Sequence, residues 1–260
     1  MAANPSSTAD VAADAGLDRA AVVDAGLDRA AGADLARASL ALARRFAAGA
    51  TLWCLAPEWP DHGRHVAVEF VHPVIMGKRA LPAVSLARTD PIAELRTAAR
   101  TGDALVIVAP ASSAIAREAV RRAPAWGVTS IWIGSGPRPS GGLADHLIWI
   151  DDETDATARY DGRVALRYHV LWELTHVCFE HPGLLADAGL DCDDDATCIT
   201  CSDEGRPAEV ASVLADGLVS VRTARGNETI DATLVGDVHT GDLVLVHAGT
   251  AIERLDLVDG

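Results

Sequence analysis

The sequence predicts an α/β protein in two parts: a doubly wound parallel sheet flanked by helices, followed by a small β-barrel. Between residues 34 and 180, short apolar runs alternate with amphipathic segments. Strands that are apolar on both faces and separated by helices indicate a parallel sheet covered on both sides. From residue 207 onward, β-branched runs are separated by turn signals at intervals of about ten residues, as is typical of a small closed barrel.

The individual strands follow from these runs. In the first part we expect buried strands at residues 51–55, 83–86, 104–109, 130–133 and 146–150. In the barrel we expect strands at residues 209–213, 219–223, 229–235 and 243–247.

Composition sets the remaining boundaries. Residues 1–33 are rich in Ala and Asp and contain DAGLDRA twice, which predicts a weakly ordered or helical arm. Residues 181–203 lose all periodicity and carry Pro, Gly and an acidic run, which predicts a linker. The two domains are therefore expected at residues 34–180 and 204–260.

Charge and hydropathy exclude several classes of partner. The formal net charge is -15 and no cluster of Lys or Arg is present, so binding to nucleic acid or to anionic membranes is not expected. No signal peptide and no apolar run of about 20 residues is found, which predicts a soluble, cytoplasmic protein. Three of the five cysteines crowd into residues 192–201, which indicates thiol or metal chemistry in a reducing compartment rather than a disulfide framework.

Two segments of the carboxy-terminal part carry a specific resemblance. GDVHTGDLVLVHAGTAIERLD at residues 236–256 and CITCSDEGRPAEV at residues 198–210 resemble the HypC/HupF chaperones that mature nickel-iron hydrogenases. The resemblance implies an OB-like barrel that binds other maturation proteins. It also implies that the barrel delivers an iron with cyanide and carbonyl ligands to the hydrogenase large subunit.

The same resemblance implies that a cysteine and a histidine contact the iron. The histidine is His247, which shares one face of a period-two strand with Leu243 and Leu245. For the cysteine we favour Cys201, which lies nearer the barrel, with Cys198 as a second ligand or redox partner. A thiolate and an imidazole suit a transition metal and leave coordination positions open. The alternative is a reducible disulfide, or two idle thiols, beside an ordinary barrel histidine.

The amino-terminal part resembles a second family. DHGRHVAVEFVHPVIMGKRALPAVSL at residues 61–86 resembles the sugar-isomerase (SIS) family, in particular phosphoheptose isomerases, and the resemblance extends over about residues 34 to 180. It implies aldose–ketose conversion through an enediol, with a glutamate base and a zinc site on facing helices. His65 matches a metal ligand of that family, and Glu69 matches its glutamate.

Helical spacing supports a second metal site. One face of a helix that starts near Pro60 carries His62, His65, Glu69 and His72, and one face of the last helix carries His169, Glu173, His176 and Glu180. We therefore expect a site, suited to zinc, formed by His65, Glu69, Glu173 and His176. The alternative is that these side chains form a solvated helix face or a subunit interface.

The phosphate-binding loops of the isomerases are altered in this chain. Trp59, in LAPEWPDHG, stands near the position of their phosphate-binding serine, and APASSA retains only Ser112 and Ser113. Losing glycines and hydroxyl donors removes the usual cradle for a phosphate, which argues against isomerase activity. Trp59, Ser112 and Ser113 remain the candidate ligand-binding residues of this part.

We therefore expect a binding protein rather than an enzyme. The resemblance implies a hydrogenase-maturation chaperone whose partners are other maturation proteins and the hydrogenase large subunit. Its SIS-like domain dimerises, docks partners or binds a small ligand, and we expect a homo-oligomer. The alternative is a metal-dependent isomerase of the sedoheptulose 7-phosphate type, with Glu69 as its catalytic base, or a sugar-phosphate-binding protein.

Overall fold

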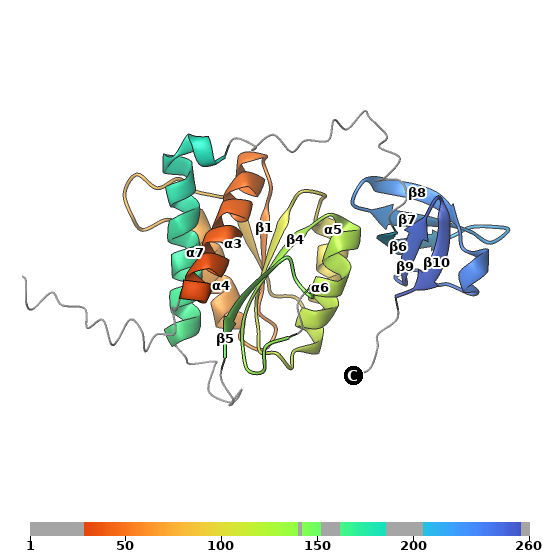
Figure 1. Ribbon diagram of the computed structural model, residues 1–260, viewed down its shortest axis with the longest axis horizontal. Helices are drawn as coiled ribbons and strands as arrows, with labels where there is room; N and C mark the ends of the chain where they lie inside the picture. Colours follow the sequence, from red (N-terminus) through yellow and green to blue (C-terminus); the bar gives the residue numbers. More distant parts are fainter. Residues whose placement is uncertain (1–28, 140–141, 152–161, 186–204, 256–260) are drawn as a thin grey trace, which may run out of the picture.

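The computed structural model describes residues 29–139, 142–151, 162–185 and 205–255 (Figure 1). Most of the expected amino-terminal arm and most of the expected linker, including Cys198 and Cys201, lie outside these residues.

The first part is a five-stranded parallel sheet in the order β2-β1-β3-β4-β5. Its side chains in β1 and β3 are buried on both faces, which explains the continuous apolar runs in the sequence. This strand order is that of flavodoxin-like doubly wound folds, in which the order reverses between β1 and β3. The strands are β1 (Leu52–Leu55), β2 (Ala83–Leu86), β3 (Ala104–Val108), β4 (Thr129–Ser135) and β5 (His146–Ile150).

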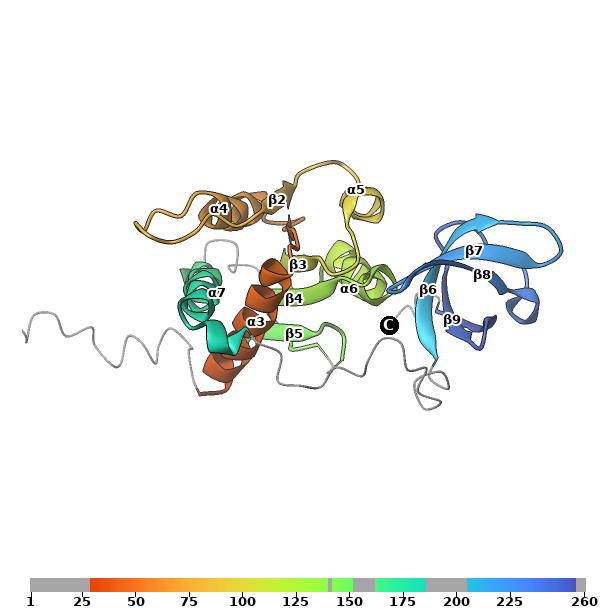
Figure 2. The same cartoon turned by 90° about the horizontal axis from the view of Figure 1, so that it is seen from above.

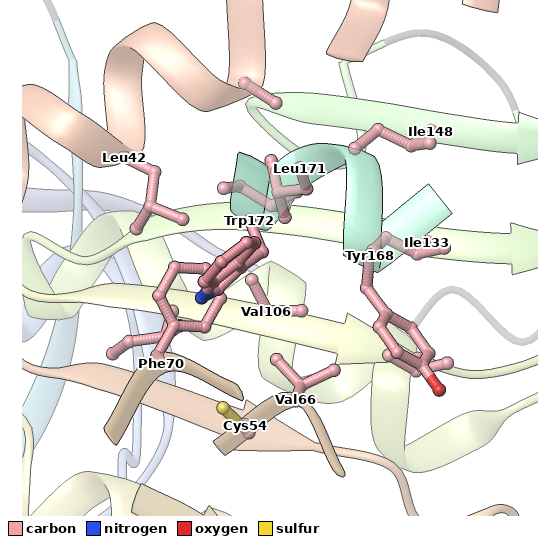
Figure 3. Packing of buried hydrophobic residues seen from close by; sticks show 14 of the residues in the cluster. Leu42, Cys54, Val66, Phe70, Val106, Ile133, Ile148, Tyr168, Leu171 and Trp172 are labelled. Carbon is pink, nitrogen blue, oxygen red and sulfur yellow. The ribbon is translucent and has the colours of Figure 1, made fainter. Parts of the chain in front are cut away.

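Helices cover both faces of this sheet (Figure 2). On one face lie α3 (Arg29–Ala47), α4 (Pro60–Val71) and α7 (Gly162–Glu180), and on the other lie α5 (Pro91–Ala98) and α6 (Ala114–Trp126). A short 3-10 turn, η2 (Pro182–Leu184), follows α7. The core under α3, α4 and α7 is formed by aromatic and branched side chains, among them Phe70, Leu171 and Trp172 (Figure 3).

Local sequence determines where these helices begin and end. Asp90 caps α5 by accepting a hydrogen bond from the amide of Ala93, and Ser113 caps α6 by accepting one from Ala116. Gly127 ends α6 in the left-handed region, with φ 67°.

The second part is a closed barrel in the order β10-β8-β7-β6-β9. Its interior holds small and branched side chains, including Ala208, Val210 and Val244. Together with the parallel sheet, this barrel confirms the predicted fold class. The strands are β6 (Arg206–Val213), β7 (Leu218–Thr223), β8 (Gly226–Asp231), β9 (Leu243–His247) and β10 (Thr250–Arg254).

Two details of the barrel differ from the sequence prediction. The third barrel strand ends at Asp231, because its carboxylate accepts hydrogen bonds from the amide and hydroxyl of Thr233 and starts a 3-10 turn, η3 (Thr233–Val235). The strand β10 was not predicted. It forms a hairpin with β9 through Ala248 and Gly249, both at positive φ.

A buried ion cluster joins the barrel to the sheet domain. Glu209 of β6 is 2% exposed, and its carboxylate accepts hydrogen bonds from Arg96 (2.8 Å) and from the indole of Trp126 (2.6 Å). Arg122 also donates to Glu209 and, at 2.7 Å, to the carbonyl of Gly241. The barrel is therefore docked on α5 and α6 through charge-assisted hydrogen bonds.

We expect Glu209→Gln to lower the free energy of unfolding of the full chain by about 2 kcal/mol, because Arg96 loses its counter-charge and Arg122, which keeps its ion pair with Glu118, loses one of two. Urea denaturation followed by circular dichroism and tryptophan fluorescence measures this loss. Glu228→Gln is the matched control, because the Glu228–Arg206 pair is about one-third exposed and should contribute no more than about 1 kcal/mol. Equal losses of unfolding free energy in the two variants would contradict a stabilising role for the buried ion cluster around Glu209.

Candidate functional site

Three potential metal ligands meet between α4 and α7. His65 and Glu69 are one turn apart on α4, and His169 projects from α7. The Nε2 atom of His65 lies 3.1 Å from Oε1 of Glu69 and 3.4 Å from Nε2 of His169. The third distance, from Nε2 of His169 to Oε1 of Glu69, is 3.7 Å.

These distances suit a metal ion. A tetrahedral zinc with bonds of about 2.0–2.1 Å separates its ligand atoms by roughly 3.3 Å, a value that the three distances bracket. The cluster therefore has both the donor types and the spacing of a three-ligand site that keeps a coordination position open.

Packing of α4 against α7 positions the cluster. The buried stripe of α4, which includes Val66 and Phe70, faces the sheet and leaves His65 and Glu69 on the flank beside α7. The indole of Trp172 on α7, which is 5% exposed, donates a 2.8 Å hydrogen bond to the backbone carbonyl of Glu69. This bond fixes the offset between the two helices.

Tyr168 connects the cluster to a further histidine. Its hydroxyl lies 3.0 Å from Nδ1 of His65 and 3.2 Å from Nδ1 of His62. Burial, reinforced by the charge of Glu69, raises the pKa of Tyr168 to about 12, so the phenol stays protonated at neutral pH. Burial also lowers the pKa of His169, against the opposing effect of Glu69, and favours the neutral imidazole that binds metals.

A pocket of about 360 Å³ opens beside the cluster. Two of the candidate ligands, Glu69 and His169, form part of its wall. The other residues that line it are Val74, Ile75, Val170, Trp172 and Glu173. The pocket wall is therefore mainly apolar, with acidic groups at its edge.

Two residues expected as metal ligands are not in the three-ligand cluster. His176 is 2% exposed, and its ring nitrogens lie 2.9 Å from the carbonyl of Trp172 and 3.1 Å from that of Arg79. Glu173 forms an ion pair with Lys78 at 3.2 Å. The structure thus brings His65 and Glu69 together with His169, which shares the helix stripe of Glu173 and His176 but was not chosen from the sequence.

The three candidate ligand-binding residues do not form a phosphate cradle. Trp59 is 5% exposed and packs in the core under α4, and the hydroxyl of Ser113 is engaged in capping α6. Ser112 is exposed beside it. The loops after β1 and β3 also contain Pro57 and Pro110, which have no amide N–H to offer.

The barrel places its candidate iron ligand at the end of β9. Val244 and Val246 point into the barrel core, so His247, half-buried, belongs to the outward face with Leu243 and Leu245. Arg206 pairs with Val246 in antiparallel register, so the chain enters β6 beside this end of β9.

A comparison with protein families finds a match that covers the barrel. Residues 205–259 match the HupF/HypC family. The match confirms the predicted resemblance of the carboxy-terminal part, and the barrel is hereafter the HupF/HypC module. Among curated proteins, none matches the chain.

Solved structures similar to the chain include two phosphoheptose isomerases. The one from Francisella tularensis has 14% identity and a TM-score of 0.49, covering 66% of this chain and 99% of its own. The one from Neisseria gonorrhoeae has 19% identity and a TM-score of 0.46, covering 64% and 97%. Among the described helices, none is long and apolar enough to cross a membrane.

We expect His176→Ala to lower the free energy of unfolding by about 1–3 kcal/mol, because the buried imidazole is replaced by a cavity and its contacts with the carbonyls of Trp172 and Arg79 are lost. Thermal and urea denaturation measure this effect. The control is His181→Ala, at an exposed histidine just beyond α7, which should change stability by less than about 0.5 kcal/mol. A neutral effect of His176→Ala would contradict a structural role for this histidine.

Proposed function

We propose that the chain is a binding protein for nickel-iron hydrogenase maturation. Its HupF/HypC module holds an iron carrying cyanide and carbonyl ligands as cargo, through His247 and Cys201. The family match at residues 205–259 carries this proposal. The partners are other maturation proteins and the hydrogenase large subunit, and the compartment is the cytoplasm, where thiols stay reduced.

Chain geometry supports the pairing of the two ligands. Gly205 precedes β6 and, from the register of Arg206 with Val246, lies beside the end of β9 that carries His247. Cys201 lies four positions before Gly205 in the sequence, a stretch that spans at most roughly 14 Å. Cys198, with a reach of at most roughly 25 Å, serves as a second ligand or redox partner.

Ligand chemistry supports the cargo. A thiolate is a soft ligand that favours low-valent transition metals, and imidazole is compatible with it. One thiolate and one imidazole leave coordination positions for diatomic ligands. The docked sheet domain then acts as a dimerisation or partner-docking platform, and we propose that the chain works as a homo-oligomer.

The test is anaerobic purification with hydrogenase-maturation proteins, followed by infrared spectroscopy for bound cyanide and carbonyl. We expect the bands in the wild-type protein and their loss in Cys201→Ala and in His247→Ala, because each removes one ligand. His239→Ala is the control, since its side chain is 80% exposed in the same module and should keep the bands. Bands that survive in His247→Ala would reject this histidine as a ligand.

We propose metal binding as a second function, carried out by the sheet domain. The observation is the three-ligand cluster of His65, Glu69 and His169. For His65 to bind through Nε2, its Nδ1 must carry the proton and donate to the oxygen of Tyr168, whose hydroxyl then donates to His62. Such a hydrogen bond orients the ring of a metal-binding histidine. Zinc, bound here, would supply a Lewis acid.

The geometry favours metal binding over sugar-phosphate isomerisation. The position of Glu69, 3.1 Å from His65 in the ligand cluster, is compatible with both functions, so the loops distinguish them. The loops that would hold a phosphate carry a buried Trp59 and a Ser113 engaged in capping. The expected activity of the sheet domain is therefore binding rather than aldose–ketose conversion.

We expect His169→Ala to weaken zinc binding to the sheet domain by at least about 100-fold, because one of three protein ligands is lost. Isothermal titration and the absorption spectrum of bound Co²⁺ report this directly. To isolate the site, the parent protein, His169→Ala and the control variant all also carry Cys198→Ala and Cys201→Ala. His72→Ala, at an exposed histidine of the same region outside the cluster, serves as the control and should bind as tightly as its parent. Equal affinities in the two variants would rule out the cluster.

A further inference from the structure

We propose that the pocket beside the His65–Glu69–His169 cluster binds an uncharged small molecule with an apolar body and an oxygen donor for the metal. The inference rests on the metal-binding function proposed for the sheet domain and names its ligand class. This class differs from a phosphorylated sugar.

The pocket wall is built for apolar contact. Val74, Ile75, Val170 and Trp172 provide most of it, and its volume of about 360 Å³ lies in the range of small-molecule sites. Val74 is 81% exposed and Ile75 is 47% exposed, so a ligand resting on them would remove apolar surface from water. The binding energy of the ligand body would therefore come from burial.

Charge at the pocket disfavours a phosphate. Glu69 and Glu173 are the charged side chains of its wall, and no lysine or arginine is among the described residues that line it. Lys78, the neighbouring cation, is held by Glu173 at 3.2 Å and by Glu180 at 2.8 Å. A phosphate monoester would bring two negative charges toward these carboxylates without a free counter-charge.

Backbone geometry also disfavours a phosphate. Phosphate cradles use amide N–H groups at glycine-rich helix starts. Here α4 starts at Pro60, after the buried Trp59, and α6 starts after its cap Ser113, whose hydroxyl already accepts a hydrogen bond from the amide of Ala116. A ligand in this pocket would therefore be held by coordination to the metal, because Glu69 and His169 belong both to the three-ligand cluster and to the pocket lining.

The test uses a series of alkylhydroxamic acids, from acetohydroxamic to octanohydroxamic acid. They are uncharged in neutral solution and bind metals through two oxygens after losing the proton of the N–OH group to the buffer. The full chain carrying Cys198→Ala and Cys201→Ala is loaded with Co²⁺, and each acid is titrated against its absorption spectrum. We expect affinity to rise about fourfold per added methylene group until the pocket is filled. Sedoheptulose 7-phosphate and inorganic phosphate should leave the spectrum unchanged at the same concentrations.

Two variants localise the effect. Ile75→Asp places a charge on the pocket wall and should reduce the affinity for octanohydroxamic acid at least tenfold while the Co²⁺ spectrum is retained. Met76→Asp is the matched control, because Met76 is adjacent, apolar and 98% exposed but does not line the pocket. It should leave the series unchanged.

The outcomes separate this inference from the function on which it rests. Failure to form the Co²⁺ spectrum in the parent protein would overturn the metal site itself. A normal spectrum with affinity independent of chain length, or with tighter binding of sedoheptulose 7-phosphate, would overturn only the ligand class. The ligand class would also be overturned if affinity did not change along the hydroxamic acid series and Ile75→Asp changed the oligomeric state measured by light scattering. A second copy of the chain would then cover the pocket.

Discussion

The hydrogen bond from the indole of Trp172 to the backbone carbonyl of Glu69 is the contact on which the sheet-domain site depends. Apolar burial holds α4 and α7 on the sheet but tolerates sliding along the helix axes, whereas a directional bond to one carbonyl does not. A slip of one helical turn is about 5.4 Å, enough to take His169 out of range of His65. The same indole contacts the ring of His176 at 4.4 Å between centroids, which keeps that histidine buried behind the site.

Periodicity explains what the sequence could predict about this site. The i, i+4 spacing of His65 and Glu69 places both on one flank of α4, since both belong to one helix. The third member depends on the offset between α4 and α7, which no spacing within either helix contains. The i, i+3 spacing within α7 predicted Glu173 and His176 as ligands. In the structure Glu173 forms an ion pair with Lys78, and the ring nitrogens of His176 lie against two backbone carbonyls.

The barrel also has a feature that local sequence patterns do not predict. Alternation along β6 predicts that Ala208 and Val210 face inward and Glu209 outward, and outward glutamates are ordinarily solvated. Only the tertiary fold brings Arg122 and Trp126 of α6 to that carboxylate and so turns a surface position into a buried junction. The fold class was predictable because it needs only local pattern, whereas the docking of the modules needs contacts between segments far apart in the chain.

Docking has a consequence for the proposed iron ligand. The outward face of β9 carries Leu243, which packs in the core of the sheet domain. His247 lies on the same face four residues later, roughly 13 Å along the strand. Because Glu209 anchors the adjacent strand, His247 is held at a fixed distance from the sheet domain. The two proposed metal sites also differ in donors. Thiolate and imidazole favour a soft iron centre, whereas two imidazoles and a carboxylate favour zinc, so the donor set of each proposed site suits the metal proposed for it.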